Sequence, residues 1–239
     1  MARISQAEWK AYKEVMRKLS DSAANTFAEI VMKAGGYGNL TEQEIMTIAY
    51  QVVAQYGNGS SAITASLYDK IAVLEKAKVL PAEMYEISFE DVAKTVNAVL
   101  RDYTDMNYMN SVVGKMVKQA GADTMVKNAI RDGAEFAWIP AGEPCAFCLT
   151  LASQGWQRAS KNAIKNGHAE HIHPNCDCQY CVRFDDTEVE GYDPSAYQKM
   201  YYSAEGRTPT DKINYMRREA YAKNKATEGI NNSELIKIN

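Results

Sequence analysis

The chain is organised around residues 145–181, which read CAFCLTLASQGWQRASKNAIKNGHAEHIHPNCDCQYC. This window contains all 5 cysteines and all 3 histidines of the 239-residue sequence. Thiolate sulfur and imidazole nitrogen are the ligands that hold Zn²⁺ in a tetrahedral site. The clustering of these residues therefore predicts a metal centre in this part of the chain.

The candidate ligands fall into two short groups. Cys145 and Cys148 form a pair in which two intervening residues let both sulfurs face one centre from a tight turn. His173, Cys176 and Cys178 form the second group, and the spacings within it also permit chelation. We expect Cys145 and Cys148 to bind zinc together with two residues of the second group.

The fifth cysteine, Cys181, lies in the alternating run 179–184, which is typical of a strand, so we expect it to pack rather than to bind metal. The separation of the two ligand groups exceeds that of the common zinc fingers, which indicates a metal that ties two separate elements together. The alternative is a cluster of reduced or disulfide-bonded cysteines without metal. The histidines favour metal, because disulfide frameworks do not require them.

Composition indicates a folded protein: 46% of the residues are hydrophobic and 24% are charged. The net charge of −3 gives no overall attraction to nucleic acid or to a membrane. The N-terminus lacks the apolar core of a signal peptide, and no apolar run is long enough to span a bilayer. We therefore expect synthesis in a cytoplasm, where cysteines stay reduced, and no membrane partner.

Helical periodicity dominates residues 1–132, which we predict to form a helical region. Capping-box patterns at Ser5-Gln-Ala-Glu8 and Thr41-Glu-Gln-Glu44 mark two helix starts. The small-residue run 57–61 is expected to break the second helix. In chain order, the expected helices cover residues 6–33, as one long or once-broken helix, and then 41–56, 63–74, 88–100 and 105–120.

Residues 133–190 are predicted to form a small α+β module that holds the zinc. A β-branched and aromatic run at 134–141 and the run at 179–184 indicate strands, and 148–153 indicates a helical turn. The remaining residues, 191–239, form a predicted helical tail. The expected fold class is thus mainly α, with a small zinc-clamped α+β module between a helical N-terminal region and the tail.

The tail contains a local excess of positive charge. Between Arg207 and Lys225 there are 6 basic residues and 2 acidic ones, with several tyrosines nearby. Such a segment is able to meet DNA or an acidic protein surface. The alternative is a solvated helix face without a partner.

Fragments of a zinc deaminase signature are also present, as His168-Ala-Glu170 and Pro144-Cys-Ala-Phe-Cys148. Their order is the reverse of the deaminase order. The additional cysteines are also able to fill the metal position that a catalytic water would need. We therefore predict no catalytic residues, and keep a zinc-dependent enzyme acting on nucleotides or nucleic acid as an alternative.

Two stretches resemble the core of the MuF-like minor head proteins of tailed bacteriophages, also called head morphogenesis proteins. They are WIPAGEPCAFCLTLASQG at 138–155 and HPNCDC at 173–178. The resemblance covers about residues 134–184 and is greatest to the versions from phages of Gram-positive hosts. The tail lies outside it.

This resemblance implies a structural minor capsid protein without catalytic activity. Such a protein is made in the host bacterial cytoplasm and resides in the virion, inside the phage head near the portal. It implies a role in capsid assembly, DNA packaging or ejection. The implied partners are portal, major capsid or scaffold proteins, with packaged DNA as a further candidate. A DNA-binding module that acts through the basic tail is a third reading of the sequence.

Overall fold

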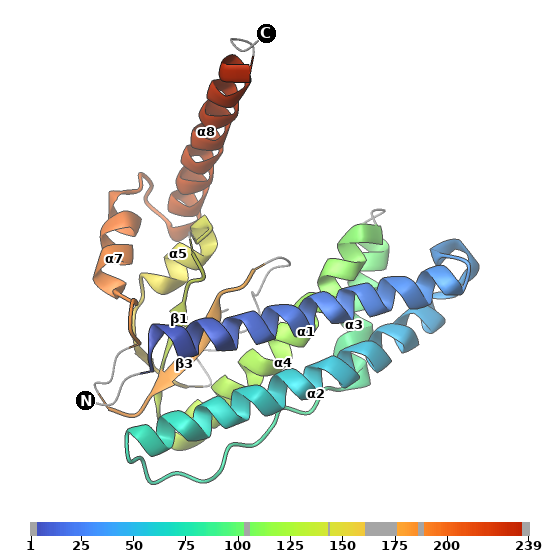
Figure 1. The fold of residues 1–239 in the computed structure, drawn as a ribbon, viewed down its shortest axis with the longest axis horizontal. Helices are drawn as coiled ribbons and strands as arrows, with labels where there is room; N and C mark the ends of the chain where they lie inside the picture. Colours follow the sequence, from blue (N-terminus) through green and yellow to red (C-terminus); the bar gives the residue numbers. More distant parts are fainter. Residues whose placement is uncertain (1–3, 103–105, 143, 161–175, 186–188, 236–239) are drawn as a thin grey trace. The chain divides into compact units, whose positions relative to one another are not determined.

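The computed structural model describes residues 4–102, 106–142, 144–160, 176–185 and 189–235. In these residues the protein is mainly helical, with seven α-helices and one three-stranded antiparallel sheet (Figure 1). The predicted fold class is therefore confirmed. None of the described helices is long and apolar enough to cross a membrane.

The first two helices begin at the predicted capping boxes. In α1 (Gln6–Lys33), the Ser5 hydroxyl accepts the amide of Glu8, and the Glu8 carboxylate accepts the amide of Ser5. Thr41 and Glu44 make the same reciprocal pair at the start of α2 (Glu42–Leu74). The two boxes satisfy backbone donors that have no partner within the helix, which fixes where each helix begins.

Helix α2 runs without interruption through residues 57–61, so the predicted break is wrong. Gly57 faces Ile87 and Ala120 so closely that a Cβ at this position would meet both side chains. The Ser61 hydroxyl donates to the carbonyl oxygen of Ala120 at 3.2 Å. The small residues thus allow close packing between helices, and the free energy of that packing outweighs their poor helix propensity.

Helix α4 (Met106–Asp132) extends well past the predicted end at residue 120. It packs against α1 and α2, against α3 (Phe89–Asp102), and against two strands of the sheet. Between α2 and α3, residues 77–88 form neither helix nor strand. Side chains of α4 bond to the backbone of this segment: Thr124 and Asn128 are buried and contact the amides of Tyr85 and Glu83.

Helices α1 to α4 share one hydrophobic core, and α1, α2 and α4 pack against one another (Figure 1). The core residues with the lowest exposure come from all four helices. They include Phe27, Val31, Ala49, Val53, Val96, Met109, Val113 and Val117.

The sheet has the order β2-β1-β3, with β1 (Glu135–Ile139) in the centre. Strand β2 (Gln157–Arg158) and strand β3 (Gln179–Arg183) both pair with β1 in the antiparallel sense. The predicted strands at 134–141 and 179–184 are thus found, with slightly shorter bounds. Trp138 lies opposite Tyr180 in the register, and their rings contact edge to face with centroids 4.6 Å apart.

The chain divides into two compact units. One comprises residues 1–139 and 156–192, and the other comprises residues 140–155 and 193–239. The second unit contains α5 (Ala146–Ala152), α7 (Pro194–Ser203) and α8 (Pro209–Leu235), and α5 packs against both other helices. The boundaries that we predicted at residues 132 and 190 remain a prediction.

Candidate metal centre

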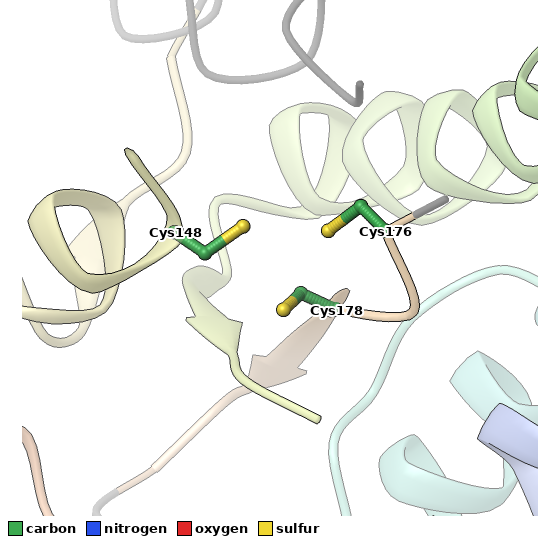
Figure 2. Close-up of side chains that lie close together, drawn as sticks. All are labelled: Cys148, Cys176 and Cys178. Carbon is green, nitrogen blue, oxygen red and sulfur yellow. The ribbon is translucent and has the colours of Figure 1, made fainter. Parts of the chain in front are cut away.

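Three cysteine sulfurs lie together. The Sγ atoms of Cys148, Cys176 and Cys178 are all within 4.8 Å of one another (Figure 2). All three side chains are buried, with exposed fractions of 0%, 4% and 4%. Cys148 is in α5, while Cys176 and Cys178 are in the turn that leads into β3. These three cysteines are among the five residues that the sequence predicted as candidate ligands.

Cys145, the first residue of the C-x-x-C pair, is the N-cap of α5. Its backbone is extended, and its sulfur accepts the amide of Cys148 at 3.5 Å. This geometry satisfies an amide at the start of the helix and holds the two cysteines on one short turn. Cys145 is exposed and is not one of the three clustered residues.

His173, the remaining predicted ligand, lies outside the described residues. The same holds for His168 and Glu170 of the deaminase-like fragment. Which four of the five candidates, Cys145, Cys148, His173, Cys176 and Cys178, hold a metal therefore stays a prediction.

Cys181 is buried in the centre of β3, opposite Ala137 of β1. Its thiol donates to the carbonyl oxygen of Val182. Burial raises the pKa of this thiol, so it remains protonated and neutral at physiological pH. It behaves as a small apolar side chain of the sheet and is separate from the three clustered sulfurs.

The clustered sulfurs suit a structural zinc ion. With Zn–S bonds of about 2.3 Å, tetrahedral geometry places ligand sulfurs about 3.8 Å apart. The three sulfurs lie within 4.8 Å of one another, so a small inward movement of the side chains brings them to that separation. None of the five cysteines, all of which lie in described segments, forms a disulfide. Three buried thiols that are close but not oxidised are compatible with a metal centre.

Two lysines lie near the Cys176–Cys178 turn. The ammonium of Lys118, on α4, donates to the carbonyl oxygen of Cys176 and to the carboxylate of Asp177, both at 2.8 Å. Burial lowers the pKa of Lys13, on α1, and nearby Cys178 and Asp177 oppose this effect. Because thiolate ligands are negative, these cations stabilise the deprotonated form that binds metal.

A comparison with known protein families shows to which family the chain belongs. The profile of the VG15 protein family matches residues 3–204. The chain belongs to the VG15 protein family. The matched segment includes the helical core, the sheet and all five cysteines, and it ends before α8. Searches of curated proteins and of solved structures gave no match.

The sequence analysis missed Lys118. It lies in the stretch Val112-Val-Gly-Lys-Met-Val-Lys118, where several neighbouring side chains are buried. The only signal in the sequence is a lysine among valines and a methionine, and Lys115 of the same stretch has the same signal. The partners of this lysine lie 58 and 59 residues further along the chain, so spacing alone does not reveal them.

Proposed function

We propose that the cysteine cluster holds one structural Zn²⁺ ion. Cys148, Cys176 and Cys178 would supply three thiolates, and Cys145 or His173 would supply the fourth ligand. The observation that supports this most directly is the approach of three buried sulfurs to within 4.8 Å. When bound, zinc supplies a cross-link between chain segments that are distant in the sequence, and its binding free energy adds to the stability of the fold.

The proposed site is structural and not catalytic. A catalytic zinc site needs an open coordination position for water, whereas a fourth protein ligand closes the site. The sulfur of Cys145, three residues before Cys148, accepts the backbone amide of Cys148, so a fourth sulfur is close to the cluster. The exposed fractions of the clustered cysteines, at most 4%, also suit a site without solvent access.

We propose further that the protein is a minor head protein of a tailed bacteriophage, of the MuF-like kind. The support is the resemblance of residues 138–155 and 173–178, together with the cysteines that these stretches bring close. The protein would lie inside the head near the portal and contact portal, major capsid or scaffold proteins. A cross-linked fold suits a protein that must survive assembly and genome release.

The tail offers a second contact, with packaged DNA. Residues 217–223 of α8 and Lys225 are exposed, and residues 217–225 carry 4 basic side chains and 1 acidic one. An exposed basic helix face attracts the phosphate backbone without reading base sequence. Lys212, which belongs to the same basic stretch, is engaged elsewhere: its ammonium donates to the carbonyl oxygen of Ala204.

The metal content of freshly purified protein tests the zinc proposal. Mass spectrometry should find about one zinc per chain after dialysis against a weak chelator. Replacing Cys148 or Cys176 by serine should abolish this content. Cys181→Ala is the matched control, because it removes a buried thiol outside the cluster, and should retain zinc. Absence of zinc in the unaltered chain would contradict the proposal.

Deletion of the gene from the phage or prophage tests the head assignment. We expect fewer filled, infectious particles, while expression of the unaltered protein in trans should restore the yield. Electron microscopy of heads and a plaque count give the two readouts. Normal numbers of filled and infectious heads without the protein would contradict the assignment, whatever the zinc content.

A further inference from the structure

Lys118 is a buried cation that contacts the turn formed by residues 176–178. Its side chain is 4% exposed, whereas that of its partner Asp177 is 37% exposed. The ammonium donates to two acceptors in one turn, the backbone carbonyl of Cys176 and the carboxylate of Asp177. The two flanking cysteines, Cys176 and Cys178, both contribute sulfur to the cluster. The lysine therefore holds the backbone between two candidate ligands.

Burial of an ammonium is costly unless it is paired and hydrogen-bonded. An apolar side chain of similar size at a buried ion-pair position often gives equal or greater stability. Packing of α4 alone therefore gives no reason for a lysine at this position. A fixed donor is useful where a short segment must present two sulfurs to one centre, and the ammonium of Lys118 supplies one to the Cys176 carbonyl in a buried hydrogen bond.

We propose that Lys118 positions the Cys176–Cys178 turn for metal binding and offsets part of the negative charge of the bound thiolates. This inference rests on the proposed zinc centre and extends it to a residue that does not touch the metal. Partners of this kind fix the orientation of ligands, and their loss typically weakens metal binding by about 10- to 100-fold. The buried location strengthens the electrostatic contribution, because the interior screens charge less than water does.

The zinc dissociation constant of the full chain provides the main test, measured by competition with a chromophoric chelator. Lys118→Met keeps the length of the side chain and removes the donor and the charge. We expect zinc affinity to fall by about 10- to 100-fold. Lys127→Met is the matched control, because it removes a lysine of the same helix whose ammonium pairs with Glu83 instead. Its zinc affinity should equal that of the unaltered chain.

Melting temperatures with and without zinc distinguish a lysine that only stabilises the fold from one that positions the metal ligands. If Lys118 only stabilises the fold, Lys118→Met lowers both melting temperatures equally and leaves the zinc affinity unchanged, which would overturn the proposal. If it positions the ligands, the increase in melting temperature that zinc produces becomes smaller. The comparison is made on each variant separately, so a lower starting stability does not affect it.

A measurement on the unaltered chain covers the case in which Lys118→Met fails to fold. Coupling between two sites is reciprocal, so zinc must stabilise the contacts of Lys118 if those contacts favour zinc. Zinc should then slow the acylation of Lys118 by an amine-reactive reagent and leave Lys127 unaffected. Equal acylation of Lys118 with and without zinc would overturn the inference. A chain that binds no zinc at all would instead end the metal-centre proposal, so the two failures are distinct.

Discussion

Asn128 makes both hydrogen bonds of a β-ladder to a single residue, Glu83. The side-chain oxygen of Asn128 accepts the Glu83 amide at 2.9 Å, and its side-chain nitrogen donates to the Glu83 carbonyl at 2.8 Å. Asn128 is fully buried in α4, while Glu83 belongs to the irregular segment between α2 and α3. The amide thus takes the place of a neighbouring strand for a segment that has none.

Asn128→Ala should lower the free energy of unfolding by about 2–3 kcal/mol, because it leaves buried backbone groups without partners. Urea unfolding measures this, and hydrogen exchange of the Glu83 amide should become faster. Glu83→Gln is the control: it changes a side chain that pairs with Lys127 at the surface and leaves the backbone contacts intact. Equal effects of the two substitutions would contradict the role of the buried amide.

Gly121 lies where α4 crosses the first two helices. A Cβ at this position would lie 2.7 Å from the Ser60 hydroxyl and 2.8 Å from the Thr64 hydroxyl, and it would also meet Met16. Gly121→Ala should therefore lower the free energy of unfolding by about 1–3 kcal/mol through overpacking, although alanine is the better helix former. Thermal or urea unfolding gives the value.

Gly59 is the matched control for this substitution. It is also within a helix, but a Cβ there would meet only Leu19, at an ordinary distance of 3.7 Å. Gly59→Ala should raise the free energy of unfolding by up to about 1 kcal/mol through helix propensity. A destabilised Gly59→Ala variant would show that the space around a glycine does not decide whether alanine raises or lowers the free energy of unfolding.

Glu75, after the last residue of α2, gives the protein a specific pH dependence. Its carboxylate accepts the amides of Phe184 and Asp185 beyond β3. Burial raises the pKa of Glu75, and these two hydrogen bonds oppose the increase only in part. The folded protein then binds this proton more tightly than the unfolded chain does. The contribution of Glu75 to stability falls as pH rises from about 4.3, the ordinary glutamate pKa, through its raised folded value.

Glu75→Gln keeps an oxygen acceptor and removes the charge. The variant should gain stability relative to the unaltered chain as pH rises through that window, and should keep the gain at pH 7. Urea unfolding at a series of pH values gives the difference. A variant that instead loses relative stability with rising pH would contradict the direction of the shift.

The zinc cross-link should also be visible in stability. Adding zinc to metal-free protein should raise the melting temperature, because the ion binds the folded state. Cys176→Ser should remove this increase, whereas Cys181→Ala should lower stability with and without zinc by a similar amount. Calorimetry on the unaltered protein and the two variants measures these melting temperatures. If zinc still raised the melting temperature of Cys176→Ser, the result would contradict Cys176 as a ligand.

The exposed basic residues of α8 lead us to expect DNA binding that weakens as the salt concentration rises. Replacing both Arg217 and Arg218 by glutamine should weaken binding and reduce the slope of log affinity against log salt by about 2. Lys212→Gln is the control, since this ammonium bonds to the backbone at the end of α7 and should contribute little to the slope. Fluorescence anisotropy with duplexes of unrelated sequence measures both values. Equal slopes for all three chains would contradict a contact through Arg217 and Arg218.

Much of the local structure could be predicted from the sequence. The starts of α1 and α2 followed from the reciprocal pairs Ser5 with Glu8 and Thr41 with Glu44, because helix caps depend on residues three positions apart. Strands β1 and β3 followed from their alternating and β-branched residues. The grouping of the cysteines in the sequence also placed Cys148, Cys176 and Cys178 among five candidate ligands, and the structure brings these three together.

Only the tertiary structure decided the features that depend on distant neighbours. Residues 57–61 remain helical because Gly57 and Ser61 pack closely on α4, although the same residues in isolation favour a break. The backbone of Glu83 hydrogen-bonds to a side chain 45 residues away, and the ammonium of Lys118 hydrogen-bonds to residues 58 and 59 positions away. Local sequence sets propensity and chemistry, whereas burial and pairing depend on what lies next to a residue in space.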